Sequence, residues 1–321
     1  MSRTKKKSPK VNTDHRDTLI QIRSVDCPLC GSGIKEPLYR DMRDVEDGIA
    51  GQYAISRCRK CGIIYLSVRP TRKSLPQCYH HDYHVRVEGG TGTVAKFIYR
   101  FKHFMEHRQL MQKIGHVPKS LLDIGCGSGG FLWELHRQWG SGCRLSGIEL
   151  ASPTTVDFPK TGIDFLIGSI EKLRPVRKYE IVTMFELLDH VYDPVKALHA
   201  ASKWLVDGGL LIGKIPHFNS PWRKIFPRHW DGFQISRHMT FFDDVSIRKV
   251  LSDDFEVLSV SNEYDPGDLG VSLCNWLVSR LSPGTRPRQS PVYLPLMLLT
   301  APLSLFMVKV LKAPCSLVFT A

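Results

Sequence analysis

The sequence has no apolar segment near its start and few acidic residues for its length. It carries 31 Asp and Glu against 44 Lys and Arg, which gives a formal net charge of +13. This excess favours anionic partners, namely nucleic acid, phosphorylated substrates or an acidic membrane surface, without choosing among them. Because residues 1–24 contain no signal peptide, we expect a basic, flexible tail and a reducing cytoplasmic compartment.

A disulfide framework is also missing. Nine cysteines in 321 residues are too sparse for a small stapled fold. The apolar fraction of 42% and the charged fraction of 23% are typical of globular proteins. A chain of this length allows one large domain beside a small one, and we predict a small domain over 25–88 and a large one over 89–321.

Four of the cysteines are spaced as metal ligands. They form two C-x2-C pairs separated by 27 residues, and a glycine that suits a tight turn follows each pair. Four thiolates complete the tetrahedron of Zn²⁺ and leave no open position, so a structural and not a catalytic site is predicted. Redox pairs are disfavoured because neither pair lies in a thioredoxin-like context. The predicted zinc ribbon has strands over 53–57 and 63–66, and its ligands are Cys27, Cys30, Cys58 and Cys61.

The large domain is organised around residues 121–132, LLDIGCGSGGFL. This stretch predicts a buried strand, a glycine-rich turn and a helix over 131–139. Glycine allows positive φ and a close approach of the backbone to a ligand, and the helix start offers free N–H groups and a positive dipole end. Asp123 ends the strand, where open α/β sheets bind ligands.

This stretch resembles the first motif of class I S-adenosylmethionine (SAM)-dependent methyltransferases. Later motifs of that family follow in order: 144–149 ends in an acid, 165–171 resembles the third strand and its turn, and 179–194 resembles the fourth strand. The resemblance implies an α/β fold with a Rossmann-like seven-stranded sheet of order 3-2-1-4-5-7-6. Its remaining elements are expected as helices over 94–115 and 195–206 and strands over 210–216, 255–261 and 315–320.

The resemblance also implies SAM as the cofactor. In the family, the acid at the position of Glu149 binds both ribose hydroxyls. The family usually has Asp where this chain has Ser169, so Glu171 or a backbone carbonyl is expected to replace the adenine contact. The predicted cofactor-binding residues are Asp123, Gly125, Cys126, Gly127, Gly129, Glu149, Ser169, Ile170 and Phe185.

Two histidines are the predicted catalytic residues. His190 follows the fourth strand above the cofactor pocket, and His238 is expected on the acceptor side. Histidine has a suitable pKa to take a proton from a hydroxyl as a methyl group arrives, although either residue could instead be structural or orient the substrate. Glu186 and Asp189 are expected to orient them.

Residues 78–84, CYHHDYH, connect the ribbon to the large domain. They are interpreted as a connector that covers the cofactor cleft or binds substrate, with a second metal site as the alternative. A ribbon, such a connector and this core together resemble bacterial sugar and polysaccharide-pathway methyltransferases, and more distantly ubiquinone-pathway O-methyltransferases. Fold resemblance limits the substrate only loosely.

An uncharged stretch covers residues 290–308, between basic flanks. Its three prolines are expected to break a regular helix, and a membrane span here would separate the last strand from its sheet. A monotopic apolar hairpin on the inner leaflet and a cap over the domain's own core are the two interpretations of this insertion, 290–313.

The predicted function is methyl transfer from SAM to a hydroxyl of a sugar, nucleotide-sugar or lipid-linked glycan precursor. The alternatives are an RNA methyltransferase that uses the ribbon and the basic tail, a methyltransferase for a quinone-like lipophilic acceptor, and a SAM-binding scaffold without catalysis. Methylation of a base amino group is disfavoured, since residues 185–188, FELL, lack the Asn/Asp-Pro-Pro-aromatic clamp. A peripheral contact with an acidic membrane surface is also expected.

Overall fold

The computed structural model describes residues 20–79, 93–150, 161–282 and 284–321. Its centre is a seven-stranded sheet in the order β11-β12-β9-β8-β5-β6-β7. The first five strands along the chain are parallel, whereas β12 runs antiparallel to both β9 and β11. The predicted order 3-2-1-4-5-7-6 is therefore confirmed. The strands are β5 (Ser120–Ile124), β6 (Arg144–Glu149), β7 (Asp164–Ile167), β8 (Tyr179–Phe185), β9 (Leu205–Pro216), β11 (Ser259–Glu263) and β12 (Ser316–Thr320).

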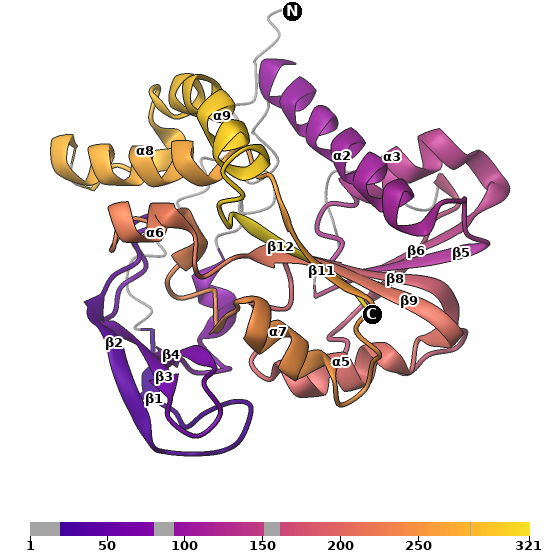
Figure 1. Cartoon of the computed structure of the whole chain (residues 1–321), viewed down its shortest axis with the longest axis horizontal. Coiled ribbons are helices and arrows are strands. Elements are labelled where there is room, and N and C mark those ends of the chain that lie inside the picture. Colours follow the sequence, from indigo (N-terminus) through magenta and orange to yellow (C-terminus); the bar gives the residue numbers. More distant parts are fainter. Residues whose placement is uncertain (1–19, 80–92, 151–160, 283) are drawn as a thin grey trace, which may run out of the picture.

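Helices cover both faces of this sheet (Figure 1). On one face lie α2 (Thr93–Ile114) and α3 (Gly130–Trp139), which bury Leu110 and Leu132. On the other face lie α5 (Pro194–Ser202) and α7 (Asp244–Leu251). Because both faces are covered, β5 and β8 are almost continuously buried, as parallel strands in doubly wound sheets are.

Several predicted boundaries move in the structure, and the strand expected over 63–66 runs to Pro70. The helix expected over 195–206 ends at Ser202, and β9 begins at Leu205 and continues through the glycine pair expected as a turn. The sixth strand, expected over 255–261, begins four residues later at Ser259. Its pairing explains the shift, because Ser259 lies opposite Thr320 and Glu263 opposite Ser316.

The N-terminal ribbon is a four-stranded antiparallel sheet in the order β1-β4-β3-β2. A strand from the large domain, β10 (Thr240–Phe241), pairs with β4 and adds a fifth strand to the ribbon sheet. The Arg237 guanidinium is fully buried and donates to the carboxylates of Asp44, Glu46 and Asp47 after β2. The ribbon strands are β1 (Ile22–Ser24), β2 (Lys35–Met42), β3 (Tyr53–Cys58) and β4 (Ile64–Pro70).

A helical hairpin lies between β11 and β12 along the chain, and in Figure 1 it is above the ribbon with α6 between them. Arg288 of this hairpin lies 3.5 Å from Glu46, just after β2. It consists of α8 (Asp268–Leu281), a short η4 (Pro287–Gln289) and α9 (Tyr293–Lys309). The expectation that prolines break this stretch is wrong, because α9 continues through Pro302. Pro295 lies in the first turn, where backbone N–H groups make no hydrogen bond within the helix, so the missing N–H of proline costs none. None of the helices in the described ranges is long and apolar enough to cross a membrane.

The remaining elements are short. They are η1 (Leu75–Cys78), η2 (Gly140–Gly142), α6 (Pro221–Ile225) and η3 (Asp231–Phe233). Most of the predicted flexible tail, 1–24, and most of the Tyr- and His-rich connector lie outside the described residues. The last residues of the predicted tail are instead ordered, because Ile22–Ser24 form β1 and pair with β4.

Candidate cofactor and active site

The turn between β5 and α3 is the glycine-rich loop predicted from the sequence. Gly125, Gly127 and Gly129 have φ of 77°, 54° and 82°, values that only glycine adopts without strain. A Cβ added to Gly125 would lie 2.9 Å from Leu187, in the loop after β8. No side chain caps α3, so its first N–H groups are left for a polar ligand.

Glu149 ends β6 and reaches across to this loop. Its Oε2 accepts a hydrogen bond from Gly127 N–H at 2.9 Å, and its Oε1 accepts from Leu150 N–H at 2.7 Å. The acid predicted to bind ribose thus lies directly against the loop. Cys126 is buried under the loop, with its N–H 3.2 Å from the Ile148 carbonyl.

Asp123 lies at the end of β5 and is 4% exposed. The Thr183 hydroxyl donates to its Oδ1 at 2.6 Å. Burial raises the pKa of Asp123 to about 7, although the hydrogen bond from Thr183 opposes this shift. A cationic ligand group beside Asp123 would restore its charged form.

The other predicted cofactor residues lie at the ends of neighbouring strands. Gly168 N–H donates to the Glu149 carbonyl at 2.8 Å, which brings the turn with Ser169 and Ile170 beside β6. The Ser169 hydroxyl lies 3.5 Å from Glu171 Oε2, so the acid proposed as its substitute is adjacent. Phe185 lies at the end of β8 with its ring 5.1 Å from that of Phe131 in α3. Loop, acids and apolar walls together fit the polar and aromatic parts of SAM.

The two predicted catalytic histidines meet beyond the end of β8. Their rings are 4.4 Å apart and nearly perpendicular. His238 is 1% exposed and donates from Nδ1 to the Gly232 carbonyl at 2.9 Å, since a carbonyl can only accept. Its Nε2 then carries a lone pair and lies 3.2 Å from Asp189 Oδ2.

This pair of groups is polar, buried and unsatisfied. Within the described residues, neither carboxylate oxygen of Asp189 nor Nε2 of His238 has a hydrogen bond. Burial raises the pKa of Asp189 well above its usual value, and burial lowers the pKa of His238 well below its usual value. Buried unpaired polar atoms are costly, so the arrangement favours a bound proton or ligand between them. With His190, these groups also have ligand atoms within 4.8 Å of one another, a spacing that suits a divalent cation.

His190 is held by a residue that the sequence did not single out as functional. The Tyr79 hydroxyl lies 3.0 Å from His190 Nδ1. Burial lowers the pKa of His190 to about 3, so its ring is neutral at pH 7. Tyr79 belongs to the aromatic connector, which was the only sequence signal that pointed toward this contact.

Lys214, at the end of β9, was also missed. Its amine is buried and lies 3.3 Å from Asp265 and 4.0 Å from Glu186. Burial would lower the pKa of Lys214, but the two carboxylates raise it above its usual value. Glu186, expected to orient a histidine, therefore faces Lys214, whereas Asp189 takes the expected place beside His238.

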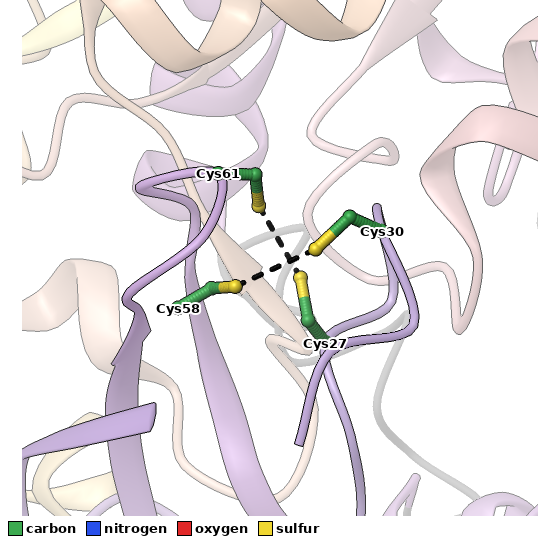
Figure 2. A group of neighbouring side chains, drawn as sticks. All are labelled: Cys27, Cys30, Cys58 and Cys61. Atoms are coloured by element: carbon green, nitrogen blue, oxygen red, sulfur yellow. Dashed lines mark hydrogen bonds between the residues drawn. The ribbon is translucent and has the colours of Figure 1, made fainter. Parts of the chain in front are cut away.

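The four predicted zinc ligands converge on one point (Figure 2). The sulfurs of Cys27 and Cys61 are 3.4 Å apart, and those of Cys30 and Cys58 are 3.5 Å apart. Sulfurs bound tetrahedrally at the usual Zn–S distance are about 3.8 Å apart, so the set fits Zn²⁺ with a small expansion. Burial alone would raise the pKa of Cys58, but hydrogen bonds from Cys61 N–H and Lys60 N–H lower it to about 7.

Comparison with known proteins supports the fold and the loop. Residues 97–260 match the family described as a methyltransferase domain. The chain is 35% identical over 100 residues to a ubiquinone biosynthesis O-methyltransferase of Hydrogenovibrio crunogenus, covering 28% of this chain and 40% of that protein. It is 31% identical over 103 residues to the enzyme of the same name from Erwinia tasmaniensis, covering 30% of this chain and 41% of that protein.

Two of the similar solved structures are methyltransferases. One is 1,6-didemethyltoxoflavin-N1-methyltransferase of Burkholderia thailandensis, with 14% identity and a TM-score of 0.47 over 89% of this chain and 98% of that one. Another is coclaurine N-methyltransferase, with 14% identity and a TM-score of 0.44 over 68% of this chain and 71% of that one. Since the family match covers more than half of the sequence, the chain belongs to the methyltransferase domain family.

Proposed function

We propose that this protein is a class I SAM-dependent O-methyltransferase whose acceptor hydroxyl belongs to a lipid-carried molecule or a sugar. The observation that carries the proposal is the unsatisfied pair of Asp189 and His238, in the loop region that packs on the glycine-rich turn through Leu187. A hydroxyl needs a proton acceptor at the moment of transfer, and this pair supplies one.

In this proposal, different residues bind SAM and accept the proton. SAM, when bound, supplies an electrophilic methyl group on a sulfonium sulfur. Asp123, Glu149 and the glycine-rich loop would hold its amino acid and ribose parts, and Ser169, Ile170 and Phe185 would enclose its adenine. The transfer breaks the bond from sulfur to methyl and forms the bond from oxygen to methyl, and the hydroxyl proton passes to Asp189 and His238.

Asp189 is the stronger proton acceptor of this site. Burial lowers the pKa of both histidines and raises that of Asp189, so proton affinity shifts from the rings to the carboxylate. In the unprotonated pair, the Nε2 lone pair of His238 lies 3.2 Å from a carboxylate oxygen. Their repulsion is relieved when one proton binds between them, which favours removal of a proton from the acceptor. His238 then acts together with Asp189, and Tyr79 and His190 orient the ring.

The acceptor class rests on two separate arguments. The ribbon, connector and core resemble sugar-pathway methyltransferases, which favours a sugar or lipid-linked glycan hydroxyl. The relatives named as ubiquinone biosynthesis O-methyltransferases favour a quinone-like lipophilic acceptor. Both arguments lead to a hydroxyl, and both classes include acceptors carried on a lipid. In this proposal the zinc site is structural, and the enzyme works in the cytoplasm.

The test is a labelling assay with the full chain, methyl-labelled SAM, and separate lipid, nucleotide-sugar and RNA pools from the source organism. Label in the lipid or sugar pool supports the proposal and distinguishes the two acceptor classes. Asp189→Asn should lower the rate by about a hundredfold, in the range of a lost proton acceptor, without weakening SAM binding. Label in RNA alone, or SAM binding with no methyl transfer to any pool, would contradict it.

The pH profile provides a second readout of the same pair. The rate should rise with pH as the Asp189–His238 pair loses its shared proton, and Asp189→Asn should abolish that rise. Asp243→Asn is a suitable control, because Asp243 caps α7 and has no contact with the histidines among the described residues. A profile that stays unchanged in Asp189→Asn would remove this residue from proton transfer.

A further inference from the structure

The helix α9 buries small polar side chains and exposes large apolar ones, which is the reverse of the usual arrangement in a globular protein. Its buried positions are Thr300, Ser304 and Val308, spaced four residues apart along one face. Five of its large apolar side chains are exposed instead, and Leu299 is 77% exposed. In water the apolar face of a helix normally turns inward, whereas small polar residues line the contact between helices that lie in lipid. We call these exposed residues, together with two that follow the helix, the α9 face; it consists of Leu298, Leu299, Leu303, Leu305, Phe306, Val310 and Leu311.

The packing of α9 on α8 fixes this orientation. A Cβ added to Gly270 of α8 would lie 2.7 Å from Met297 Cα and 2.8 Å from Thr300 Oγ1. The two backbones are therefore as close as small residues allow, and a leucine cannot be accommodated between them. The Tyr264 hydroxyl also donates to the Ala301 carbonyl at 2.9 Å, which holds the middle of α9 in place.

The part of the sequence that carries the α9 face has only basic charged residues. Residues 269–321 contain no Asp or Glu and five Lys or Arg. Lys309 and Lys312 are exposed beside the apolar residues at the end of α9, and Lys309 is 3.9 Å from Glu263 of β11. A second copy of this chain would bring like charges together, and RNA would leave the leucines in water. An anionic lipid surface satisfies both the charge and the apolar area.

The position of α9 in the fold excludes a span and permits a surface contact. A helix of its 17 residues is about 25 Å long, shorter than a bilayer core of about 30 Å. The chain leaves the sheet at β11 and returns to it at β12, its neighbour in the same sheet. Both ends of the hairpin are thus held on the same side, and α9 can lie only along a membrane surface.

We propose that the α9 face docks this protein on an anionic bilayer surface, with its leucines at the acyl boundary and Lys309 and Lys312 on lipid phosphates. This contact goes beyond methyl transfer and does not depend on it. It would keep the carboxyl ends of the strands close to acceptors that are carried in lipid.

The test is flotation of the full chain with vesicles of phosphatidylcholine alone or mixed with phosphatidylglycerol. We expect binding to the anionic vesicles, and we expect the double variant Leu299→Glu, Leu303→Glu to lower the partition coefficient about tenfold or more. Both side chains are exposed, so the fold should tolerate the change, and an unchanged melting temperature would verify this. The matched control is Val176→Glu, an 81% exposed apolar residue before β8, which should leave binding unchanged.

Charge is tested separately with Lys309→Gln and Lys312→Asn; asparagine suits the positive φ of Lys312, which is 55°. Together they should reduce binding to anionic vesicles and abolish the preference over neutral ones. Binding that survives the leucine variants would overturn the proposal, since the basic tail would then carry it. Dimerisation in lipid-free buffer that Leu299→Glu disrupts would instead assign the α9 face to a second copy. Binding to RNA with none to vesicles would also overturn it.

Discussion

The hydroxyl of Tyr79 lies 3.0 Å from Nδ1 of His190, so the residue that follows η1 contacts the loop after β8. These positions are 111 residues apart in the sequence. The contact holds the His190 ring against that of His238, and it links the ribbon side of the chain to the proposed site of proton transfer.

We predict that Tyr79→Phe lowers kcat about tenfold and leaves SAM affinity unchanged. The variant removes the hydrogen bond to His190 Nδ1 and lets the ring turn away from His238, so only the step that needs their orientation suffers. Steady-state kinetics and SAM titration measure the two quantities. Tyr39→Phe is the control, because its hydroxyl accepts from Arg223 at 2.6 Å and has no role in the site. Equal losses in both variants would show that Tyr79 acts through stability alone.

Asp123→Asn should raise the melting temperature of the SAM-free protein above that of the parent protein, and this gain should be larger at pH 8 than at pH 5. The pKa of Asp123 is raised from 3.8 to about 7 in the folded state, so the folded protein binds more protons than the unfolded chain between these values. The stability contributed by the protonated form is present at low pH and is lost as pH rises toward 7. Asparagine removes this loss and still accepts from Thr183.

Thermal melting at the two pH values measures this effect, and a gain of a few degrees at pH 8 is expected. The same variant should weaken SAM binding, because the carboxylate proposed to face the cofactor is gone. If the melting temperature of Asp123→Asn fell with rising pH as steeply as that of the parent protein, the raised pKa could not belong to Asp123.

Removal of zinc should destabilise the large domain as well as the ribbon. Cys27 and Cys58 are buried in the same apolar cluster as residues of β5, β8 and α7, so loss of the metal disturbs that cluster. We expect one Zn²⁺ per chain by elemental analysis, and a melting temperature lower by about 10 °C after chelation or in Cys58→Ser. Cys143→Ser is the control, since this buried cysteine lies far along the chain before β6. Chelation without any change in melting temperature would refute a structural metal.

Arg237→Gln should lower the free energy of unfolding by about 3–5 kcal/mol, because it leaves buried carboxylates without their partner. The guanidinium lies 2.6 Å from Asp47, 3.0 Å from Glu46 and 3.2 Å from Asp44, and it is fully buried. Urea unfolding gives the change. Arg177→Gln breaks the exposed pair with Asp164 and should cost less than about 1 kcal/mol. A similar small effect at Arg237 would mean that the ribbon does not depend on this cluster.

Local sequence determined the elements that form a ligand-binding frame. The apolar run that ends at Asp123, the glycines at 125, 127 and 129, and the acid at Glu149 specify a strand, a turn with positive φ and a second strand end, since each depends on neighbouring residues. The two C-x2-C pairs likewise specify four convergent sulfurs. The sheet order followed from the resemblance of these ordered motifs to the methyltransferase family.

Tertiary structure decided which distant side chains meet. Asp189 lies beside His238, 49 residues further along the chain, and the Tyr79 hydroxyl contacts His190. Glu186 was expected to orient a histidine, but its carboxylate faces the Lys214 amine instead. These contacts depend on burial and on how loops pack at the ends of the strands, which no local pattern encodes. The apolar stretch 290–308 shows the same division: its composition was compatible with a lipid contact or with a cap over the core, but only the close contact of Gly270 with α9 determined that Leu298, Leu299 and Leu303 are exposed.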